Sequence, residues 1–397
     1  MARATVDAHV ERVTALLETA LSNPAIEHVP LDAALGRVTA HAVVSPIDLP
    51  LFRNSQMDGF AVHADDVAVV PARLLVVGEI AAGITEPSLI GTEGRAVRIM
   101  TGAPLPEDAD AVVPVEDTTA DGDAVIIGRS RAVGEYVRER GSDVRTGQQI
   151  LDAGIRLAPR HLGVLAAVGL SSVRVRARAR VAVITTGSEL VPAGAEPQYG
   201  QLFDSNGVAL AAAARAAGAE VAWQGHVVDE PALMVAALTE AAAVSDVIIT
   251  SGGISMGAYE VVREVLEPLG AQVGTVAMQP GGPQATALFE GVPVICFPGN
   301  PVSSQLSFEV FVAPLLRQAA GMPRAERARR VLAHDIDSVP GKRQFLRGRI
   351  VDSGLVAQVA GPGSHLVAAL AAADSLIIVP EDVLMLKAGE TVETWML

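Results

Sequence analysis

The sequence is poor in aromatic residues, cysteine and lysine. Aromatic residues make up 3% of its 397 residues, so the cores must be packed mainly with small aliphatic side chains. Cys296 is the only cysteine, which excludes an intramolecular disulfide and favours a reducing compartment. Because Cys296 ends an apolar strand-like run, a buried structural thiol is favoured over a nucleophile. Lys342 and Lys387 are the only lysines, so Arg carries nearly all of the positive charge.

Long uncharged apolar runs are also missing. No stretch reaches the roughly 18 apolar residues that indicate a membrane helix, and the N-terminal residues form a charged segment without a signal core. The formal net charge of −15 argues against a nucleic-acid-binding surface, which needs a basic face. We therefore expect a cytoplasmic protein that binds neither membranes nor nucleic acid.

Segments with different periodicity follow one another along the chain, and they predict a multidomain protein of the α/β and β classes. Apolar residues at helical spacing predict a helix over residues 5–22. Residues 178–322 alternate between strand-like and helix-like segments, which predicts a doubly wound, mostly parallel sheet with helices on both faces. The expected domains are a helical linking domain (1–26 and 146–177), a β-rich module with helices (27–145), the α/β domain (178–322) and a small C-terminal β-barrel or sandwich (323–397).

Three strand-like runs of the α/β domain end in loops of small polar residues. These loops begin at Thr185, Thr250 and Pro298. Parallel strands end at the same edge of an open sheet, so we expect the loops to gather where such folds bind ligands. Small residues leave backbone N–H groups uncovered, which suits an oxyanion or a phosphate.

Each of these features also has a purely structural interpretation. Asn300-Pro301 is a typical helix start, and Asp229 could cap a helix that begins at Pro231. The glycines after Thr250 could serve only a tight turn that needs positive φ. Alternatively, Glu189 and Asp229 could hold Mg²⁺ through their carboxylates, with Glu260 as a third candidate, although a lone Glu on a helix is ordinarily solvated.

The N-terminal half contains polar segments that are weak evidence by themselves. Asn54–Ala61 includes Asp58-Gly59, an ordinary hairpin-turn pair, and Arg98–Pro104 has the same ambiguity. The mixed charges of Arg138–Asp143 are typical of a solvated loop.

Taken in order, these segments resemble the molybdopterin molybdenumtransferases of the MoeA type, which are related to the C-terminal enzymatic domain of gephyrin. The matches span nearly the entire chain. They are Asn54–Ala61 (NSQMDGFA), Arg98–Pro104 (RIMTGAP), Arg140–Asp143 (RGSD), Thr186–Leu190 (TGSEL), Asp204–Asn206 (DSN), Ser251–Gly257 (SGGISMG), Pro298–Ser303 (PGNPVS) and Gly363–His365 (GSH).

The resemblance implies a cytoplasmic homodimer that inserts molybdate into adenylylated molybdopterin with release of AMP, assisted by Mg²⁺ or Zn²⁺. It implies catalytic roles for Asp58, Thr101, Asp143, Glu189 and Asp229. Our hypothesis is that Glu189 and Asp229 hold the metal, with Glu260 as a third ligand. Pro298 and Pro301 also match family positions tied to activity. The residues that we expect to bind substrate are Ser205, Asn206, Gly252, Gly253, Ser255, Pro298, Gly299, Asn300, Pro301, Ser303, Arg347 and Ser364.

One loop departs from the family pattern. Many members carry Lys-Pro-Gly-Lys-Pro where this chain has Gln279–Pro283, so two lysines are replaced by Gln279 and Gly282. Arg347 and Arg349 are candidates for the missing positive charge. The departure keeps a second hypothesis open, a degenerate paralogue that binds molybdopterin or a partner without catalysis. A third is a related molybdopterin adenylyltransferase. The choice between molybdate and tungstate, and the preferred cation, stay open.

Overall fold

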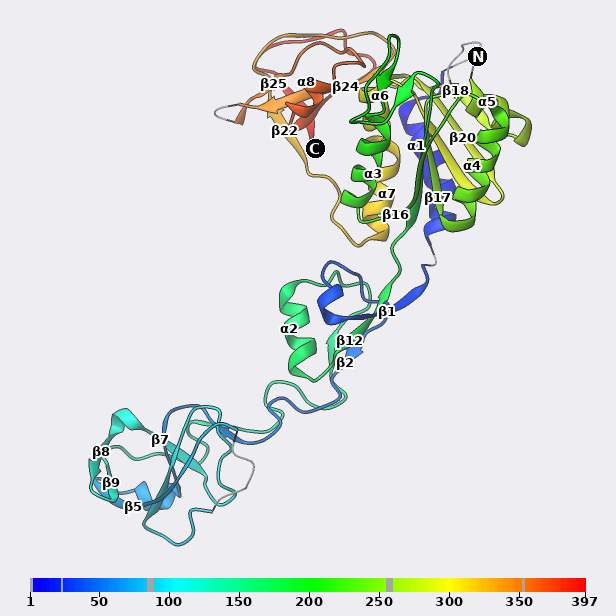
Figure 1. Ribbon diagram of the computed structural model, residues 1–397. Coiled ribbons are helices and arrows are strands. Elements are labelled where there is room, and N and C mark those ends of the chain that lie inside the picture. Colours follow the sequence, from blue (N-terminus) through cyan, green and yellow to red (C-terminus); the bar gives the residue numbers. More distant parts are fainter. Residues whose placement is uncertain (1–2, 23, 84–88, 255–259, 352–353) are drawn as a thin grey trace. The chain divides into compact units, whose positions relative to one another are not determined.

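The computed structural model describes residues 3–22, 24–83, 89–254, 260–351 and 354–397, and the chain divides into two compact units (Figure 1). The first unit comprises Met1–Glu27 and Arg176–Leu397, and the second comprises His28–Val175. Ser255, one of the predicted substrate-binding residues, lies outside the described residues.

A six-stranded sheet forms the centre of the first unit, in the order β16-β13-β17-β21-β20-β18. The four strands on the β16 side run parallel to one another, whereas β20 pairs antiparallel with β21 and β18 pairs antiparallel with β20. The predicted doubly wound, mostly parallel sheet is therefore confirmed. The strand bounds are β13 (Arg180–Thr186), β16 (Glu220–Val227), β17 (Val247–Ser251), β18 (Gln272–Thr275), β20 (Pro283–Phe289) and β21 (Val292–Phe297).

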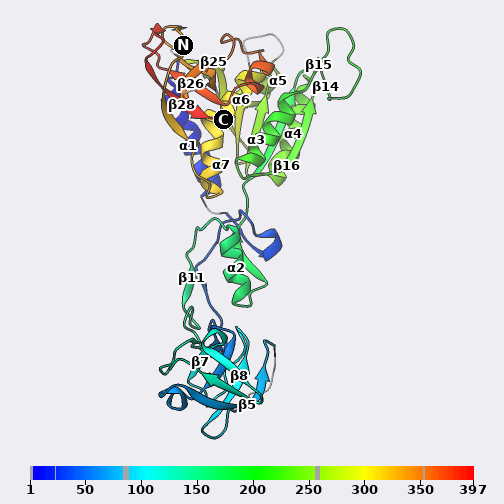
Figure 2. The ribbon, with the colours of Figure 1, turned by 90° about the vertical axis from the view of Figure 1, so that its left-hand side faces the viewer.

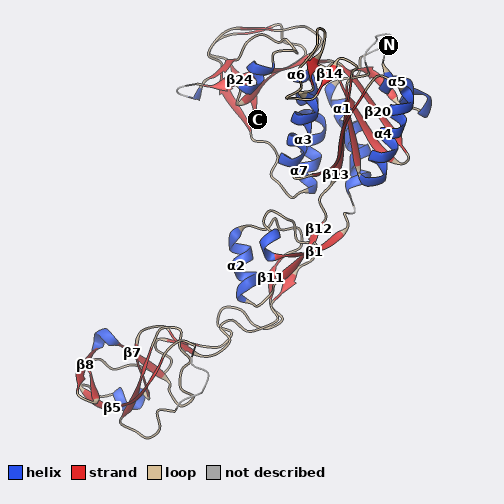
Figure 3. Ribbon diagram, in the orientation of Figure 1, coloured by secondary structure: helices blue, strands red, loops and turns tan. Residues whose placement is uncertain are grey.

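Helices cover both faces of this sheet, as Figures 2 and 3 show. Side chains alternate along the strands, so Val183 and Ile249 face one core while Ile184 and Ile248 face the other. The first core is closed by α1 (Val6–Leu21), α3 (Asn206–Ala216), α6 (Pro301–Ser307), the π-helical turn η5 (Phe308–Val312) and α7 (Ala313–Ala319). The second is closed by α4 (Pro231–Val244) and α5 (Val261–Leu266). Cys296 is fully buried in the second core, so the interpretation as a structural thiol is confirmed.

The N-terminal helix α1 differs from the prediction in its position. Thr5 caps it by accepting a hydrogen bond from the Ala8 N–H at 3.1 Å. Its buried side chains, Val13 and Leu17 among them, pack in the core that covers the central sheet. The predicted helical domain that joined residues 1–26 to 146–177 is therefore not formed, because residues up to 27 and residues 146–175 belong to different units.

A second six-stranded sheet belongs to the C-terminal part of the first unit, in the order β19-β24-β26-β28-β22, with β25 pairing with β24. Its members are β19 (Met278–Gln279), β22 (Arg327–Val331), β24 (Arg343–Ile350), β25 (Val356–Gln358), β26 (Ser375–Val379) and β28 (Thr391–Met396). Phe345, Leu376 and Ile378 of this sheet join the core around α1. The smaller elements nearby are β14 (Leu190–Val191), β15 (Leu202–Phe203), η4 (Glu267–Leu269), β23 (Ile336–Asp337), α8 (Val367–Ala371) and β27 (Met385–Leu386).

The second unit is built on a six-stranded sheet in the order β7-β4-β6-β5-β9-β8, as the β-rich prediction requires. The sheet consists of β4 (Gly59–Val62), β5 (Ala72–Ile80), β6 (Arg95–Ile99), β7 (Ala111–Pro114), β8 (Thr118–Asp121) and β9 (Ala124–Ile127). The remaining elements are η1 (Leu31–Ala33), β2 (Val43–Val44), β3 (Asn54–Ser55), η2 (Ala64–Val67), η3 (Val115–Asp117), β10 (Val137–Arg138), β11 (Gln149–Leu151) and α2 (Pro159–Ala167), with β1 (Ile26–Pro30) paired to β12 (Ser172–Arg176). In the described part of the chain, no helix has the length and apolarity to cross a membrane.

Candidate functional site

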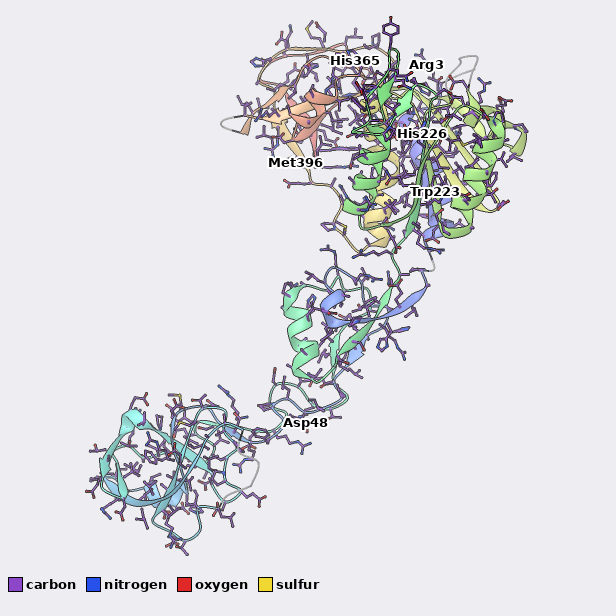
Figure 4. All side chains as sticks on the ribbon, in the orientation of Figure 1. Arg3, Asp48, Trp223, His226, His365 and Met396 are labelled. Atoms are coloured by element: carbon purple, nitrogen blue, oxygen red, sulfur yellow. The ribbon has the colours of Figure 1, made fainter. Side chains whose placement is uncertain are left out.

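The three polar loops at the strand ends of the first unit do meet, and they line one cavity of about 880 Å³. The loops after β13, β17 and β21 form one part of its wall. Two further segments complete it, the loop between β18 and β20 and the C-terminal loop Pro362–His365. His365, labelled in Figure 4, belongs to this C-terminal loop. Of the predicted residues, the cavity lining includes Glu189, Ser205, Asn206, Asp229, Gly252, Gly253, Glu260, Pro298, Gly299, Asn300, Pro301, Ser303 and Ser364.

Asn206, the first residue of α3, joins two of the polar loops through buried hydrogen bonds. Its Nδ2 donates to Ser251 Oγ at 2.9 Å and to the Gly299 carbonyl at 2.7 Å. Ser251 Oγ in turn lies 3.0 Å from Ser304 Oγ on α6. All three side chains are buried. Since buried hydrogen bonds of this kind are costly to break, Asn206 holds the walls of the cavity at a defined distance.

Two glycines after β17 allow the backbone of this loop to lie against the loop after β13. Gly252 and Gly253 have φ of +99° and +65°. A Cβ on Gly252 would lie 2.6 Å from the Thr186 carbonyl oxygen, and one on Gly253 would lie 2.9 Å from Val262 Cγ2. Both positions therefore require glycine for the turn, as the structural interpretation held. Both also line the cavity, where Gly253 is partly exposed and the buried Gly252 donates its N–H to the Phe297 carbonyl at 3.1 Å.

Asp229 organises the loop after β13. Its Oδ1 accepts from Thr186 Oγ1 at 2.8 Å, and its Oδ2 accepts from the Ser188 N–H at 3.0 Å. It is not the cap of α4, because Glu230 occupies the N-cap position, and so that alternative was wrong. Both carboxylate oxygens of Asp229 are thus used inside the protein, although the residue still lines the cavity.

The other two acidic residues with a predicted metal role also line the cavity. Glu189 is exposed, and its carboxylate lies close to Gly187, where a Cβ would be 2.8 Å from either carboxylate oxygen. Glu260 immediately precedes α5. Among the residues that the structure describes, no group of three or more His, Cys, Asp or Glu side chains could hold a metal. The protein therefore does not form a complete metal site from its own side chains in this part of the chain.

The start of α6 offers fewer free donors than the sequence suggested. Asn300 occupies the N-cap position but makes no side-chain capping hydrogen bond, and its side chain is exposed. Pro301 has no N–H, and the Val302 N–H donates to the Ser364 carbonyl at 3.1 Å. Two of the first three helical positions are thus unavailable to an anion, which leaves the amide of Ser303.

Arg347, predicted to bind substrate, lies outside the cavity lining. It is buried, and its guanidinium donates to the carbonyls of Gly361 and Gly363. Burial lowers the pKa of Arg347 from its ordinary value. The side chain thus anchors the loop that carries Ser364 and His365. Arg349, the other candidate, is exposed and also outside the lining.

The loop without lysines is held by glutamines. Gln344 Nε2 donates to Gln279 Oε1 at 2.6 Å, and Gln284 Nε2 donates to the Gly281 carbonyl at 2.8 Å. Lys342 lines the cavity beside this loop. No local motif in the sequence marks Lys342 as a site residue, and its one distinguishing feature there is that the chain has only two lysines.

The predicted residues of the N-terminal half lie in the second unit. Asp58 Oδ1 accepts from the Thr101 N–H at 2.6 Å and from Thr101 Oγ1 at 2.9 Å, which lowers the pKa of the Asp58 carboxyl. Asp143 is exposed. The hairpin interpretation of Asp58-Gly59 is wrong, because the preceding strand β3 pairs with β10 whereas β4 pairs with β6 and β7. Gly59 begins β4, and a Cβ there would lie 2.0 Å from the Val113 carbonyl oxygen of β7.

Comparisons with known proteins agree along the length of the chain. Family models described as "MoeA N-terminal region (domain I and II)", "Probable molybdopterin binding domain" and "MoeA C-terminal region (domain IV)" match residues 4–169, 182–318 and 329–397. "Molybdopterin molybdenumtransferase 2" of Mycobacterium tuberculosis is 43% identical over 382 residues, which cover 92% of this chain and 94% of the relative. "Molybdopterin molybdenumtransferase 1" of that organism is 37% identical and covers 97% of each chain. A crystal structure of a MoeA protein from Pyrococcus horikosii superposes with a TM-score of 0.84 at 34% identity and covers 100% of this chain and 99% of that one.

Proposed function

The chain belongs to the MoeA family of molybdopterin molybdenumtransferases. We therefore propose that the protein inserts molybdate into adenylylated molybdopterin, with release of AMP, and that the reaction takes place in this cavity. The family places the enzyme in molybdenum cofactor biosynthesis. The adenylylated form of the substrate and the release of AMP are the parts that we add.

The observation that carries this proposal is the convergence of five polar segments on one cavity. Its volume of about 880 Å³ falls within the usual range of roughly 300–1,000 Å³ for small-molecule sites. Gly252 and Gly253 contribute no side chains to the wall, so a phosphate can approach the backbone there without meeting a Cβ. Asn206 and Asp229 keep the loops after β13 and β21 in place, which supports a role in positioning rather than in bond breaking.

We extend the proposal to a divalent cation, Mg²⁺ or alternatively Zn²⁺, at the acidic side of the cavity. Glu189 and Glu260 would hold it together with Asp229, and the ligand phosphates would supply further oxygens, as Mg²⁺ commonly requires. That arrangement suits a set of carboxylates that is incomplete without substrate. When bound, such a cation neutralises phosphate charge. The chain's own residues then orient the pterin and keep the adenylyl link exposed to attack.

We further propose that the enzyme is a cytoplasmic homodimer in which Asp58, Thr101 and Asp143 take part in catalysis. A single buried cysteine is compatible with a reducing compartment. The hydrogen bonds of Asp58 to Thr101 keep that carboxylate ionised and oriented. Light scattering of the purified chain tests the dimer. Cell fractionation tests the location, and recovery in a membrane pellet would contradict it.

The test of the main proposal is to incubate the purified protein with adenylylated molybdopterin, Mg²⁺ and molybdate, and to measure AMP by chromatography. We expect AMP release that depends on molybdate. The replacement of two family lysines by Gln279 and Gly282, both in the cavity lining, favours a non-catalytic molybdopterin-binding protein as the second candidate. Pterin binding without AMP release would establish that candidate. ATP-dependent adenylylation of free molybdopterin would establish an adenylyltransferase instead.

A further inference from the structure

The described lining of the cavity is strongly acidic. Glu189, Asp204, Asp229 and Glu260 all contribute to it, whereas Lys342 is the only Lys or Arg among the described lining residues. Asp204 accepts from Thr185 Oγ1 at 2.6 Å, so it is held as an acceptor at the wall. An anionic ligand that enters such a site is repelled unless a positive charge lies within a few ångströms.

The pairing of two distant strands brings Lys342 to the loop that lacks cations. β19 and β24 pair in parallel, with Gln279 opposite Gln344. The Arg343 N–H donates to the Ala277 carbonyl at 2.9 Å, which fixes the backbone next to Lys342. Gln344 directs its side chain to Gln279 in the cavity wall. Lys342 lies two residues earlier, in the bend immediately before β24, and it lines the same cavity.

The neighbouring basic side chains are committed to other partners. Arg343 forms ion pairs with Asp7 at 2.7 Å and with Glu381 at 3.1 Å, and Arg347 is bonded to carbonyls of the C-terminal loop. Lys342, by contrast, is half-buried and makes no hydrogen bond or ion pair with any residue that the structure describes. Its ammonium group thus retains all three donors for a ligand.

Backbone N–H groups alone do not supply the donors that an oxyanion requires in this cavity. At the start of α6, Pro301 lacks an N–H and the Val302 N–H is used by Ser364. A compact, freely rotating ammonium group can donate hydrogen bonds to a tetrahedral oxyanion and balance its charge.

We propose that Lys342 supplies the positive charge that binds the tetrahedral oxyanion in this cavity, either molybdate or the phosphate of the pterin. The inference rests on the proposed function, because it concerns the same site. It assigns to Lys342 the electrostatic task that Gln279 and Gly282 cannot perform. Lys342 then contacts the ligand directly and makes the cavity selective for an anion.

The experiment uses the full chain and measures each ligand alone, with molybdate titrated by calorimetry and phosphorylated molybdopterin by fluorescence. We expect Lys342→Gln to weaken the affinity for one of the two ligands by about 10- to 100-fold, the usual worth of a hydrogen bond to a charged group. Lys342→Arg should retain most of the binding. The matched control is Lys387→Gln, which removes the other lysine, bonded to Asp335 at 2.9 Å and outside the cavity lining.

A rescue variant distinguishes the loss of the Lys342 charge from a structural effect of the substitution. Gly282 lines the cavity, and a Cβ there would lie no closer than 3.4 Å to its neighbours, so a longer side chain can enter. Gly282→Lys combined with Lys342→Gln should recover at least part of the lost affinity, and raised salt should weaken binding in the wild type more than in Lys342→Gln. A merely structural role of Lys342 would give neither result.

Unchanged affinity of Lys342→Gln for both ligands, in a protein whose wild type binds them and releases AMP, would overturn the inference and leave the proposed function intact. Equal losses in Lys342→Gln and Lys387→Gln would also overturn it. A wild type that binds neither ligand and releases no AMP would overturn both. Which of the two ligands responds identifies the oxyanion.

Discussion

The side-chain amide of Asn206 donates to the backbone carbonyl of Gly299 at 2.7 Å, so the start of α3 is bonded to the loop after β21. The bond crosses the wall of the cavity and leaves both residues in its lining. The geometry of the site therefore depends on a buried contact between segments 93 residues apart in sequence.

Asn206→Ala is expected to lower the stability of the first unit and to weaken pterin binding together. The change removes the Asn206 donor from the Gly299 carbonyl and one of the hydrogen bonds of Ser251 Oγ, at a cost of about 1–3 kcal/mol in the free energy of unfolding. Urea unfolding followed by tryptophan fluorescence measures this unit, because both tryptophans, Trp223 and Trp395, belong to it. Val208→Ala, at an exposed position on the same helix, is the control and should change neither quantity.

Asp229→Asn is expected to raise the Mg²⁺ concentration needed for half-maximal activity, on the order of tenfold or more. The amide cannot accept from both Thr186 and Ser188 as the carboxylate does, so the loop that carries Glu189 loses an anchor. The neighbouring Glu230→Gln, which changes the charge by the same amount at a helix start without a capping bond, is the control. A similar Mg²⁺ requirement for both variants would show that Asp229 does not position the acidic side of the cavity.

Gly252→Ala and Gly299→Ala form a pair with opposite expected results. At Gly252 the positive φ and a Cβ only 2.6 Å from the Thr186 carbonyl oxygen should cost about 1–3 kcal/mol or more and displace the loop. At Gly299 the Cβ would lie 3.5 Å from Gly252 Cα, an ordinary contact. Thermal unfolding and pterin affinity measure both effects. Equal tolerance at the two positions would contradict the close-approach argument.

The stability of the first unit is expected to fall as the pH drops from 6.5 to 4, in part because of His9. Burial, and secondarily the charge of Arg12, lowers the pKa of His9 from 6.5 to about 4, and its ring packs edge-on against Phe311 at 4.6 Å. In this window the unfolded chain binds a proton at His9 that the folded chain does not. The stability that the folded protein gains by keeping His9 neutral is therefore complete above pH 6.5. It declines below that pH, by ~3 kcal/mol in total.

Replacing His9 by Leu should flatten the dependence of the unfolding free energy on pH between 4 and 6.5, as measured by urea titrations at several pH values. His334→Leu, at an exposed position of the same unit, is the control and should keep the wild-type slope. A slope in His9→Leu equal to that of the wild type would show that another group titrates.

Much of the fold followed from local patterns. The helix expected over residues 5–22 is α1 (Val6–Leu21), and α4 begins at Pro231 as expected, since Pro is favoured in the first turn of a helix. The alternation of strands and helices was enough to predict the parallel sheet. It was not enough to predict β18 and β20, because their antiparallel pairing depends on contacts across the sheet.

The sequence by itself determined which loops form the site. The apolar runs Val181–Ile184, Val247–Ile249 and Val292–Phe297 lead into small polar residues, and parallel connection leaves those ends at one edge. Only the tertiary structure decided what each residue does there. The placement of α1 in the first unit, the use of Asp229 within its own loop and the withdrawal of Arg347 from the cavity all depend on long-range packing. Lys342 reaches the site because β24 pairs with β19, and no local pattern in the sequence specifies the partner of a strand.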